Sequence, residues 1–262
     1  MDLGIAGNTA LVTASSSGLG KASGMALARE GANVVLNGRD EERLLSAVAE
    51  VDAAGTGDVH GIVGDLTNSG DITNLVAETV DMFGGLDHLV TSAGGPPGGE
   101  FFDIPQAAWY EAFDLLVMSV VQLVHEAEPY LRSGAGTIVT ITSRSVKEAI
   151  ETLVLSNAVR MGVIGLGKTL ARECGPDIRV NSVLPDAIDT ERLAELIESG
   201  VQSGEFDSME AARQAHADGI PVGRLGSPQE LGDMVAFLSS ERAAFINGAA
   251  IPIDGGRSRS NV

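Results

Sequence analysis

Short apolar runs alternate along the chain with longer segments in which apolar residues recur at helical spacing. Buried parallel strands are typically near-continuous apolar runs, and their alternation with helices predicts a parallel sheet covered on both faces. The runs that we interpret as strands are Thr9–Thr13, Asn33–Asn37, Val59–Val63, Leu86–Thr91, Gly136–Thr142, Asp177–Val183 and Ala249–Ile253. We therefore predict an α/β fold, a doubly wound parallel sheet of about seven strands in a single domain, residues 1–262.

Helical patterns fill the intervals between these runs. The start of one helix is clear, because Ser227 is a typical N-cap residue and Pro228 is favoured at the first helical position. An acidic helical stretch at about 189–220 is predicted to form a mobile lid over a ligand, and a surface helical hairpin is the alternative. The other predicted helices run to Glu30 after the first strand and over 41–53, 68–83, 106–132 and 152–174.

Composition narrows the classes of partner. The chain has a formal net charge of −19, and its lysines are Lys21, Lys147 and Lys168. Binding to nucleic acid or to an anionic membrane needs a basic surface, so we expect neither partner. We also expect no metal site, and no apolar run approaches the ~18–20 residues of a membrane span.

The same composition bears on the environment of the protein. Acid-rich, lysine-poor surfaces keep proteins soluble in concentrated salt, so we hypothesise a halophilic protein whose stability improves in molar KCl. An ordinary acidic cytosolic protein is the alternative. The one cysteine, Cys174, excludes an internal disulfide and favours a reducing, cytoplasmic location.

A glycine-rich turn, Ala14–Gly20, follows the first strand and opens a helix. Free N–H groups at a helix N-terminus bind anions, and glycine lets a phosphate approach the backbone, so this turn is typical of a dinucleotide pyrophosphate site. Two glycines alone are a weak signal, which the preceding strand and the following helix strengthen. The cofactor-binding residues predicted here are Thr13, Ser15, Ser17, Gly18, Leu19 and Gly20.

The end of the second strand bears on the choice of cofactor. Enzymes that select NAD usually carry an acidic residue there, whereas this chain has Gly38 followed by Arg39. An arginine suits a 2′-phosphate, so we predict that NADP(H) is preferred and that NAD(H) is possible. The alternative is that Arg39 is a solvated residue at the start of a helix that Asp40 caps.

The segment Ser143–Arg160 consists of a serine at the end of a strand, a loop and the start of a long helix. It resembles the catalytic segment of the short-chain dehydrogenase/reductase family, with a 3-oxoacyl-ACP-reductase-like pattern. In that family a tyrosine follows the serine after thirteen residues and a lysine follows after four more; here these positions hold Ser156 and Arg160. The resemblance implies a Rossmann-type fold and hydride transfer between a nicotinamide cofactor and a small carbonyl or alcohol substrate.

The resemblance covers residues 6–256 and is most specific over 223–256, where the residues are structural. It implies that Asp65 and Leu66 contact the adenine and that Arg160 holds the nicotinamide ribose. The remaining positions that it implies for cofactor binding are Ser92, Ala93, Gly94, Pro185, Ile188 and Thr190. Departures from the family pattern occur at Ala14 and Asp186, which replace glycines, and at Leu116, which replaces an asparagine of the proton relay.

The missing tyrosine and lysine leave three interpretations open. In an active oxidoreductase, Ser143 would orient the carbonyl, and water held by Ser143 and Ser156, or Lys147, would supply the proton. Ser156 is a poor acid at neutral pH, and Arg160 cannot titrate as a relay, although both occupy catalytic positions. The second interpretation is a catalytically silent cofactor sensor or scaffold subunit. The third is proton abstraction or dehydration, with Glu148 or Glu151 as the base.

The two long helices predicted at 106–132 and 152–174 bear on assembly. Members of the family usually associate through these helices, and here the second one has a wide apolar face at Val154, Leu155, Val159 and Met161. The resemblance therefore implies a homotetramer or a homodimer.

Overall fold

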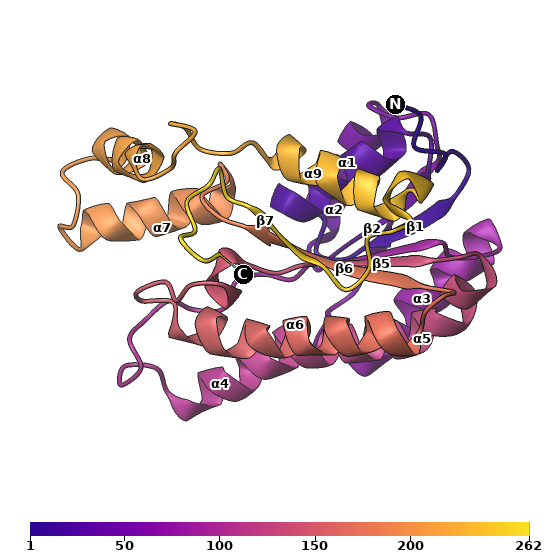
Figure 1. Ribbon diagram of the computed structural model, residues 1–262, viewed down its shortest axis with the longest axis horizontal. Coiled ribbons are helices and arrows are strands. Elements are labelled where there is room, and N and C mark those ends of the chain that lie inside the picture. The colour runs from indigo at the N-terminus through magenta and orange to yellow at the C-terminus, as the bar shows by residue number, and fades with distance from the viewer. Residues whose placement is uncertain (262) are drawn as a thin grey trace.

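Seven parallel strands form one sheet through the middle of the protein (Figure 1), and the computed structural model describes residues 1–261. The strand order β3-β2-β1-β4-β5-β6-β7 means that the chain builds one edge of the sheet, returns to the middle and builds the other edge. The strands are β1 (Thr9–Val12), β2 (Asn33–Gly38), β3 (Val59–Val63), β4 (His88–Thr91), β5 (Thr137–Ile141), β6 (Arg179–Pro185) and β7 (Ala250–Ile253). This arrangement confirms the predicted doubly wound, Rossmann-type sheet.

Helices cover both faces of the sheet, α1, α2 and α9 on one side and α3, α5 and α6 on the other (Figure 1). Helices α7 and α8 lie beyond the carboxyl ends of the strands. The helices are α1 (Gly18–Arg29), α2 (Glu41–Asp52), α3 (Ser69–Phe83), α4 (Gln106–Phe113), α5 (Ser119–Ser133), α6 (Val154–Glu173), α7 (Glu191–Gln202), α8 (Met209–Asp218) and α9 (Pro228–Ser239). Each face of the sheet therefore has its own apolar core, because the strands are buried on both sides.

The predicted long helix at 106–132 is continuous but not uniform. A π-helical turn at Asp114–Met118 joins α4 to α5. The combined helix, Gln106–Ser133, is long and apolar enough to cross a membrane by length and composition, which the search for apolar runs did not anticipate. Its buried side chains pack in the protein core, so the length serves packing here.

Polar side chains form hydrogen bonds between the carboxyl ends of neighbouring strands. Asn37, at the end of β2, accepts from the backbone N–H of Ala14 at 3.1 Å and donates to the carbonyl of Gly64 at 3.0 Å. Thr13 exchanges two hydrogen bonds with the backbone of Ser92, at 2.7 and 2.9 Å. The ends of β1, β2, β3 and β4 are therefore fixed relative to one another where a ligand would bind.

Candidate active site

The carboxyl ends of the strands and the first turn of α7 enclose a cavity of about 640 Å³. The predicted cofactor residues that line it are Ser17, Gly18, Leu19, Gly20, Arg39, Asp65, Leu66, Ser92, Ala93, Gly94, Arg160, Pro185, Ile188 and Thr190. Of the predicted catalytic residues, Ser143, Ser156 and Arg160 line the same cavity. The structure thus brings together side chains that lie far apart in the sequence, at the place where a doubly wound sheet binds its ligands.

Two predicted cofactor residues, Thr13 and Ser15, are buried and do not line the cavity. Thr13 is bonded to the backbone of Ser92, and the Ser15 hydroxyl donates to the carbonyl of Val12 at 2.6 Å. Both hydroxyls therefore bind the backbone at the strand ends and do not face the cavity. Lys147 also lies outside the lining, so the expectation that it faces the substrate finds no support in the geometry.

The turn between β1 and α1 has the tight geometry that a phosphate site needs. Ala14 has a φ of +44°, a left-handed conformation that a glycine would adopt with less strain. A Cβ at Gly20 would lie 2.6 Å from the carbonyl oxygen of Ala14, so only glycine fits there. The backbone and the N-terminus of α1 are thereby presented to the cavity, as a pyrophosphate requires.

Two arginines flank the end of β2. Arg39 is 79% exposed, and its guanidinium lies 3.9 Å from Asp65. Hydrogen bonds from the backbone and hydroxyl of Thr67 lower the pKa of Asp65, and the charge of Arg39 adds little. Arg43, in the first turn of α2, also lines the cavity and forms an ion pair with Glu191 of α7. Sequence reasoning missed Arg43, although its position four residues after Arg39 was a usable signal.

Asp40 is the N-cap of α2, where its side chain accepts from the backbone N–H of Arg43 at 2.8 Å. The cap proposed in the alternative interpretation of Arg39 is therefore present. Arg39 nevertheless lines the cavity. A solvated arginine at the start of a capped helix is therefore compatible with an arginine that faces a bound ligand.

The two serines of the catalytic segment have different environments. Ser143 caps a short 3-10 turn by accepting from the backbone N–H of Ser145 at 3.1 Å, which leaves its own proton free to donate. The Ser156 hydroxyl is buried and lies 3.0 Å from the hydroxyl of Ser145. Ser145, which the sequence did not single out, therefore fixes both serines.

Arg160 lies in the cavity wall with 8% of its surface exposed. One N–H group donates to the carbonyl of Ile141 at 3.5 Å, and among residues 1–261 its Nε has no hydrogen-bond partner. Burial, and secondarily the nearby charge of Arg192, lower the pKa of Arg160 to about 10. Arg160 is therefore a charged, largely unpaired hydrogen-bond donor at neutral pH.

Asp186, where the resemblance predicted a departure from a family glycine, belongs to an ionic network. Its carboxylate lies 3.0 Å from Nε of Arg144 and 3.4 Å from Arg257. Arg144 also pairs with Glu148 at 3.1 Å, and Glu148 accepts from the backbone N–H of Arg259 at 3.2 Å. The Nε of Arg144 meets the distance of an ion pair but lacks the alignment of a hydrogen bond. The replacement of glycine is thus matched by two arginines.

The candidate bases of the third interpretation lie elsewhere. Glu148 is held by Arg144 and does not line the main cavity, and Glu151 lines a separate cavity of about 390 Å³. The relay position predicted at Leu116 is apolar and buried against α6, while its neighbour Leu115 lines the main cavity. Neither carboxylate is therefore placed to take a proton from a ligand there.

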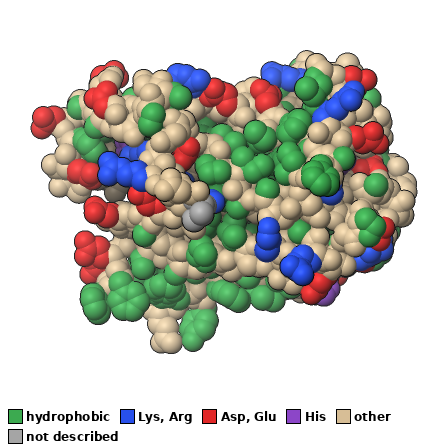
Figure 2. Space-filling model, in the orientation of Figure 1, with side chains coloured by type: hydrophobic (Ala, Val, Ile, Leu, Met, Phe, Trp, Pro, Cys, Tyr) green, Lys and Arg blue, Asp and Glu red, His purple; other side chains and the backbone are tan. Residues whose placement is uncertain are grey.

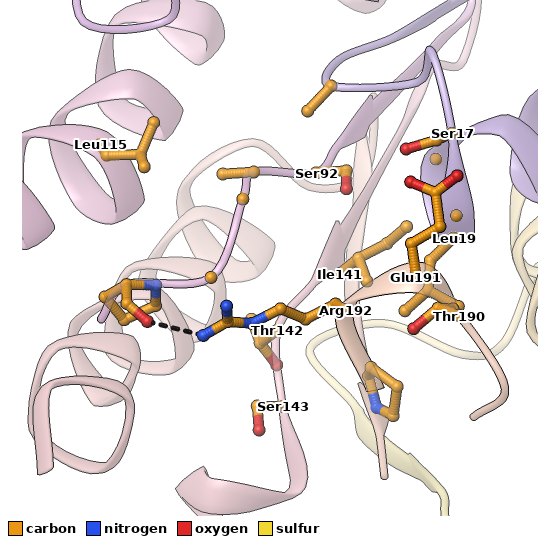
Figure 3. A pocket seen from close by; sticks show the side chains of 18 of the residues that line it. Ser17, Leu19, Ser92, Leu115, Ile141, Thr142, Ser143, Thr190, Glu191 and Arg192 are labelled. Carbon is orange, nitrogen blue, oxygen red and sulfur yellow. Dashed lines mark hydrogen bonds between the residues drawn. The ribbon is translucent and has the colours of Figure 1, made fainter. Parts of the chain in front are cut away.

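The first turn of α7 crosses the opening of the cavity. Thr190 caps this helix, and Arg192 donates to the carbonyl of Pro96 at 3.1 Å. In Figure 3 the side chain of Arg192 extends away from Thr190 across the cavity, whereas Glu191 extends toward Ser17. The predicted lid is thus helical, and its first turn is fastened on both sides of the cavity.

Comparisons with known proteins agree with this geometry. The family model described as Enoyl-(Acyl carrier protein) reductase matches residues 13–258. A 3-oxoacyl-(acyl-carrier-protein) reductase of Thermotoga maritima is 31% identical, over 95% of this chain and 97% of that protein. Dehydrogenase/reductase SDR family member 2 of Homo sapiens is 31% identical, over 96% of this chain and 86% of that protein.

Solved structures show the same likeness. The crystal structure of L-sorbose reductase from Gluconobacter frateurii, complexed with NADPH and L-sorbose, matches with a TM-score of 0.94 and 30% identity. The match covers 99% of this chain and 100% of that one. The chain therefore belongs to the short-chain dehydrogenase/reductase family of oxidoreductases.

Proposed function

We propose that this protein is an NADP(H)-dependent oxidoreductase that interconverts a small carbonyl compound and an alcohol without a catalytic tyrosine. The observation that carries the proposal is the position of Ser143, whose hydroxyl retains a free proton in the cavity that the glycine-rich turn opens. A bound nicotinamide cofactor would supply or accept the hydride. The chain's own side chains hold the substrate oxygen and stabilise the charge that develops on it.

Ser143 donates its hydrogen bond to the substrate oxygen. Arg160 donates to the ribose hydroxyls. Its positive charge also favours a negative charge on the substrate oxygen, and this attraction is stronger in a buried site than in water. In the reductive direction the carbon gains the hydride and the oxygen gains a proton from water at Ser143. General acid help contributes about 10²–10⁴-fold, so the lack of a tyrosine slows turnover without abolishing it.

The preference for NADP(H) is supported by the end of β2. Arg39 and Arg43 line the cavity there, and a Cβ at Gly38 would lie 3.0 Å from the side chain of Ser16. An acidic side chain of the kind that selects NAD would be crowded at position 38, whereas two arginines suit a 2′-phosphate.

A titration of the purified protein with NADPH and NADH, followed by nicotinamide fluorescence at low and high KCl, tests the proposal. Tighter binding of NADPH, followed by turnover with carbonyl substrates, would support it. Binding of neither cofactor would overturn it.

The alternative function is a cofactor-binding sensor or scaffold. It is favoured by the pairing of Ser156 with Ser145, which leaves the tyrosine position without an acid. NADPH binding without turnover on a broad carbonyl and alcohol panel would select this alternative.

The proposed assembly is a homotetramer or homodimer in a reducing cytoplasm. Large apolar side chains are exposed on and before α4, at Phe101, Phe102, Tyr110 and Phe113, and Figure 2 shows an apolar patch at that end of the molecule. We assign this surface to a second copy of the chain. A monomer mass in light scattering at working salt would contradict the assignment, and stability that does not improve in molar KCl would contradict salt adaptation.

A further inference from the structure

The cavity holds a positive charge that the protein does not neutralise. Four arginines and four acidic residues line it, and each acidic residue forms an ion pair: Asp65–Arg39, Asp186–Arg144, Glu191–Arg43 and Glu195–Arg192. Among residues 1–261, Arg160 is the lining arginine that has no ion pair. A buried, uncompensated guanidinium in a protein with a net charge of −19 indicates that a negative ligand belongs beside it.

A second arginine faces the same space. Arg192 stands over the backbone of Gly95, where a Cβ would lie 3.1 Å from its Nε, and it lines the same cavity as Ser143. Its ion pair with Glu195 spans 3.2 Å, but the Glu195 side chain is 64% exposed. Exposed pairs of this kind contribute little, so a ligand carboxylate can replace Glu195 at low cost. Arg160 and Arg192 carry like charges in the wall of one cavity, and an anion bound there would offset both.

We infer that the substrate is a short oxo acid, or the corresponding hydroxy acid, whose carboxylate binds to Arg192 while its carbonyl oxygen accepts from Ser143. The charge of Arg160, whose donors hold the ribose, favours an anionic ligand in the same cavity. The inference rests on the proposed oxidoreductase function and adds the substrate class to it. Guanidinium groups bind carboxylates through paired, charge-assisted hydrogen bonds, and Arg160 uses one of its five donors, at 3.5 Å. Arg192 is thus assigned as the residue that selects an acid over its neutral analogue.

The test compares acids with their amides in protein loaded with NADP⁺, so that no reduction consumes the probe. The pairs are pyruvate with pyruvamide, acetoacetate with acetoacetamide and levulinate with levulinamide, which vary the distance from carbonyl to carboxylate. Calorimetry gives the dissociation constants for the wild-type protein and for Arg192→Met and Arg192→Lys. Arg29→Met, which removes an exposed charge of α1 outside the cavity, is the matched control.

In the wild type, we expect one acid to bind about 10- to 100-fold more tightly than its amide, as for hydrogen bonds to a charged group. Arg192→Met should remove this preference by weakening acid binding, with unchanged affinity for the amide and for NADP⁺. Arg192→Lys, which keeps the charge and loses the fork, should give an intermediate preference. Arg29→Met should behave as the wild type.

Equal affinity for acid and amide in every pair, or no acid binding, would overturn the inference if NADP⁺ still binds, and the proposed oxidoreductase function would stand. An acid preference that survives in Arg192→Met would also overturn it. Failure of the protein to bind NADP⁺ or NADPH would instead overturn the proposed function itself, and the inference with it.

Discussion

At the ends of β1 to β4 the cavity is lined by the backbone of the glycine-rich turn and by the exposed arginines Arg39 and Arg43, whereas at β5, β6 and α7 it is lined by the hydroxyls of Ser143 and Ser156 and by the buried Arg160. The first region presents its backbone through the close approach of Gly20 to Ala14, and Ala14 itself has a left-handed conformation. The second region contains Ser156, Arg160 and the ionic network of Asp186. Phosphate and ribose binding depends on backbone that the fold supplies, while proton transfer depends on single side chains that can change.

The largest expected effect is a loss of turnover from a substitution in the second region alone. Ser143→Ala removes the donor to the substrate oxygen and should lower kcat by about 10²–10³-fold, with an unchanged dissociation constant for NADPH. Steady-state kinetics with a substrate found by screening would measure it. Ser145→Ala, which disturbs the pair with Ser156, should cost less than Ser143→Ala. Wild-type turnover of Ser143→Ala would show that the serine has no central role.

Acid acts on the sheet that both regions share. His88 in β4 is buried between Asn8 and Thr137, and burial lowers its pKa to about 4. In the unfolded chain His88 binds a proton near pH 6.5, whereas in the folded chain it stays neutral down to about pH 4. The free energy of unfolding therefore decreases as pH falls from about 6.5 to about 4. The loss should reach about 3 kcal/mol in urea unfolding at a series of pH values. An equally steep loss in His88→Gln would contradict this assignment.

The ionic network of the second region can be broken separately. Arg144→Met leaves Asp186 with Arg257 alone and should lower the free energy of unfolding by about 2–3 kcal/mol. Asp186→Gly in the same protein, which removes the carboxylate left with a single partner, should recover part of that loss. A double-mutant cycle from chemical denaturation measures the coupling, and strictly additive effects would argue against the network.

The role of the first region is tested by the affinity for the two nicotinamide cofactors. Arg39→Ser should raise the dissociation constant for NADPH by about tenfold and leave that for NADH unchanged, because the 2′-phosphate alone is lost as a partner. Fluorescence titration measures both constants. An equal loss for the two cofactors would place Arg39 outside the 2′-phosphate site.

The smallest effect concerns the strained turn. Ala14→Gly relieves a positive φ and should raise the free energy of unfolding by about 0.5–1 kcal/mol. Ala49→Gly, on the exposed face of α2, should lower it by about 1 kcal/mol. Thermal denaturation of the two variants would show opposite shifts, and a shift of the same sign in both would refute the strain at Ala14.

The first region was the more predictable one for a physical reason. Apolar periodicity located all seven strands, and residues at strand ends such as Asp65 and Ser92 are placed by the topology of the sheet. Helix starts with a local signal, such as Ser227 and its capping box with Glu230, were equally readable.

Interactions between distant side chains were not readable. Arg43 meets Glu191 across 148 positions, and Arg257 meets Asp186 across 71. No local pattern connects such pairs, because they depend on which loops the sheet brings together. The role predicted for Lys147 stays a prediction, since a loop residue's position in the sequence does not fix the side to which it points.

The ionic network also has a consequence for synthesis on the ribosome. Strands β1 to β4 are neighbours in the sheet and have all been made at residue 91, but α1, which follows the glycine-rich turn, packs on α9 (Pro228–Ser239). The second region needs β7 and the contacts of Arg257 and Arg259, which are translated much later. Both regions therefore reach their final packing only when the last elements of the chain have been made, and a ligand that binds the folded site would favour this late step.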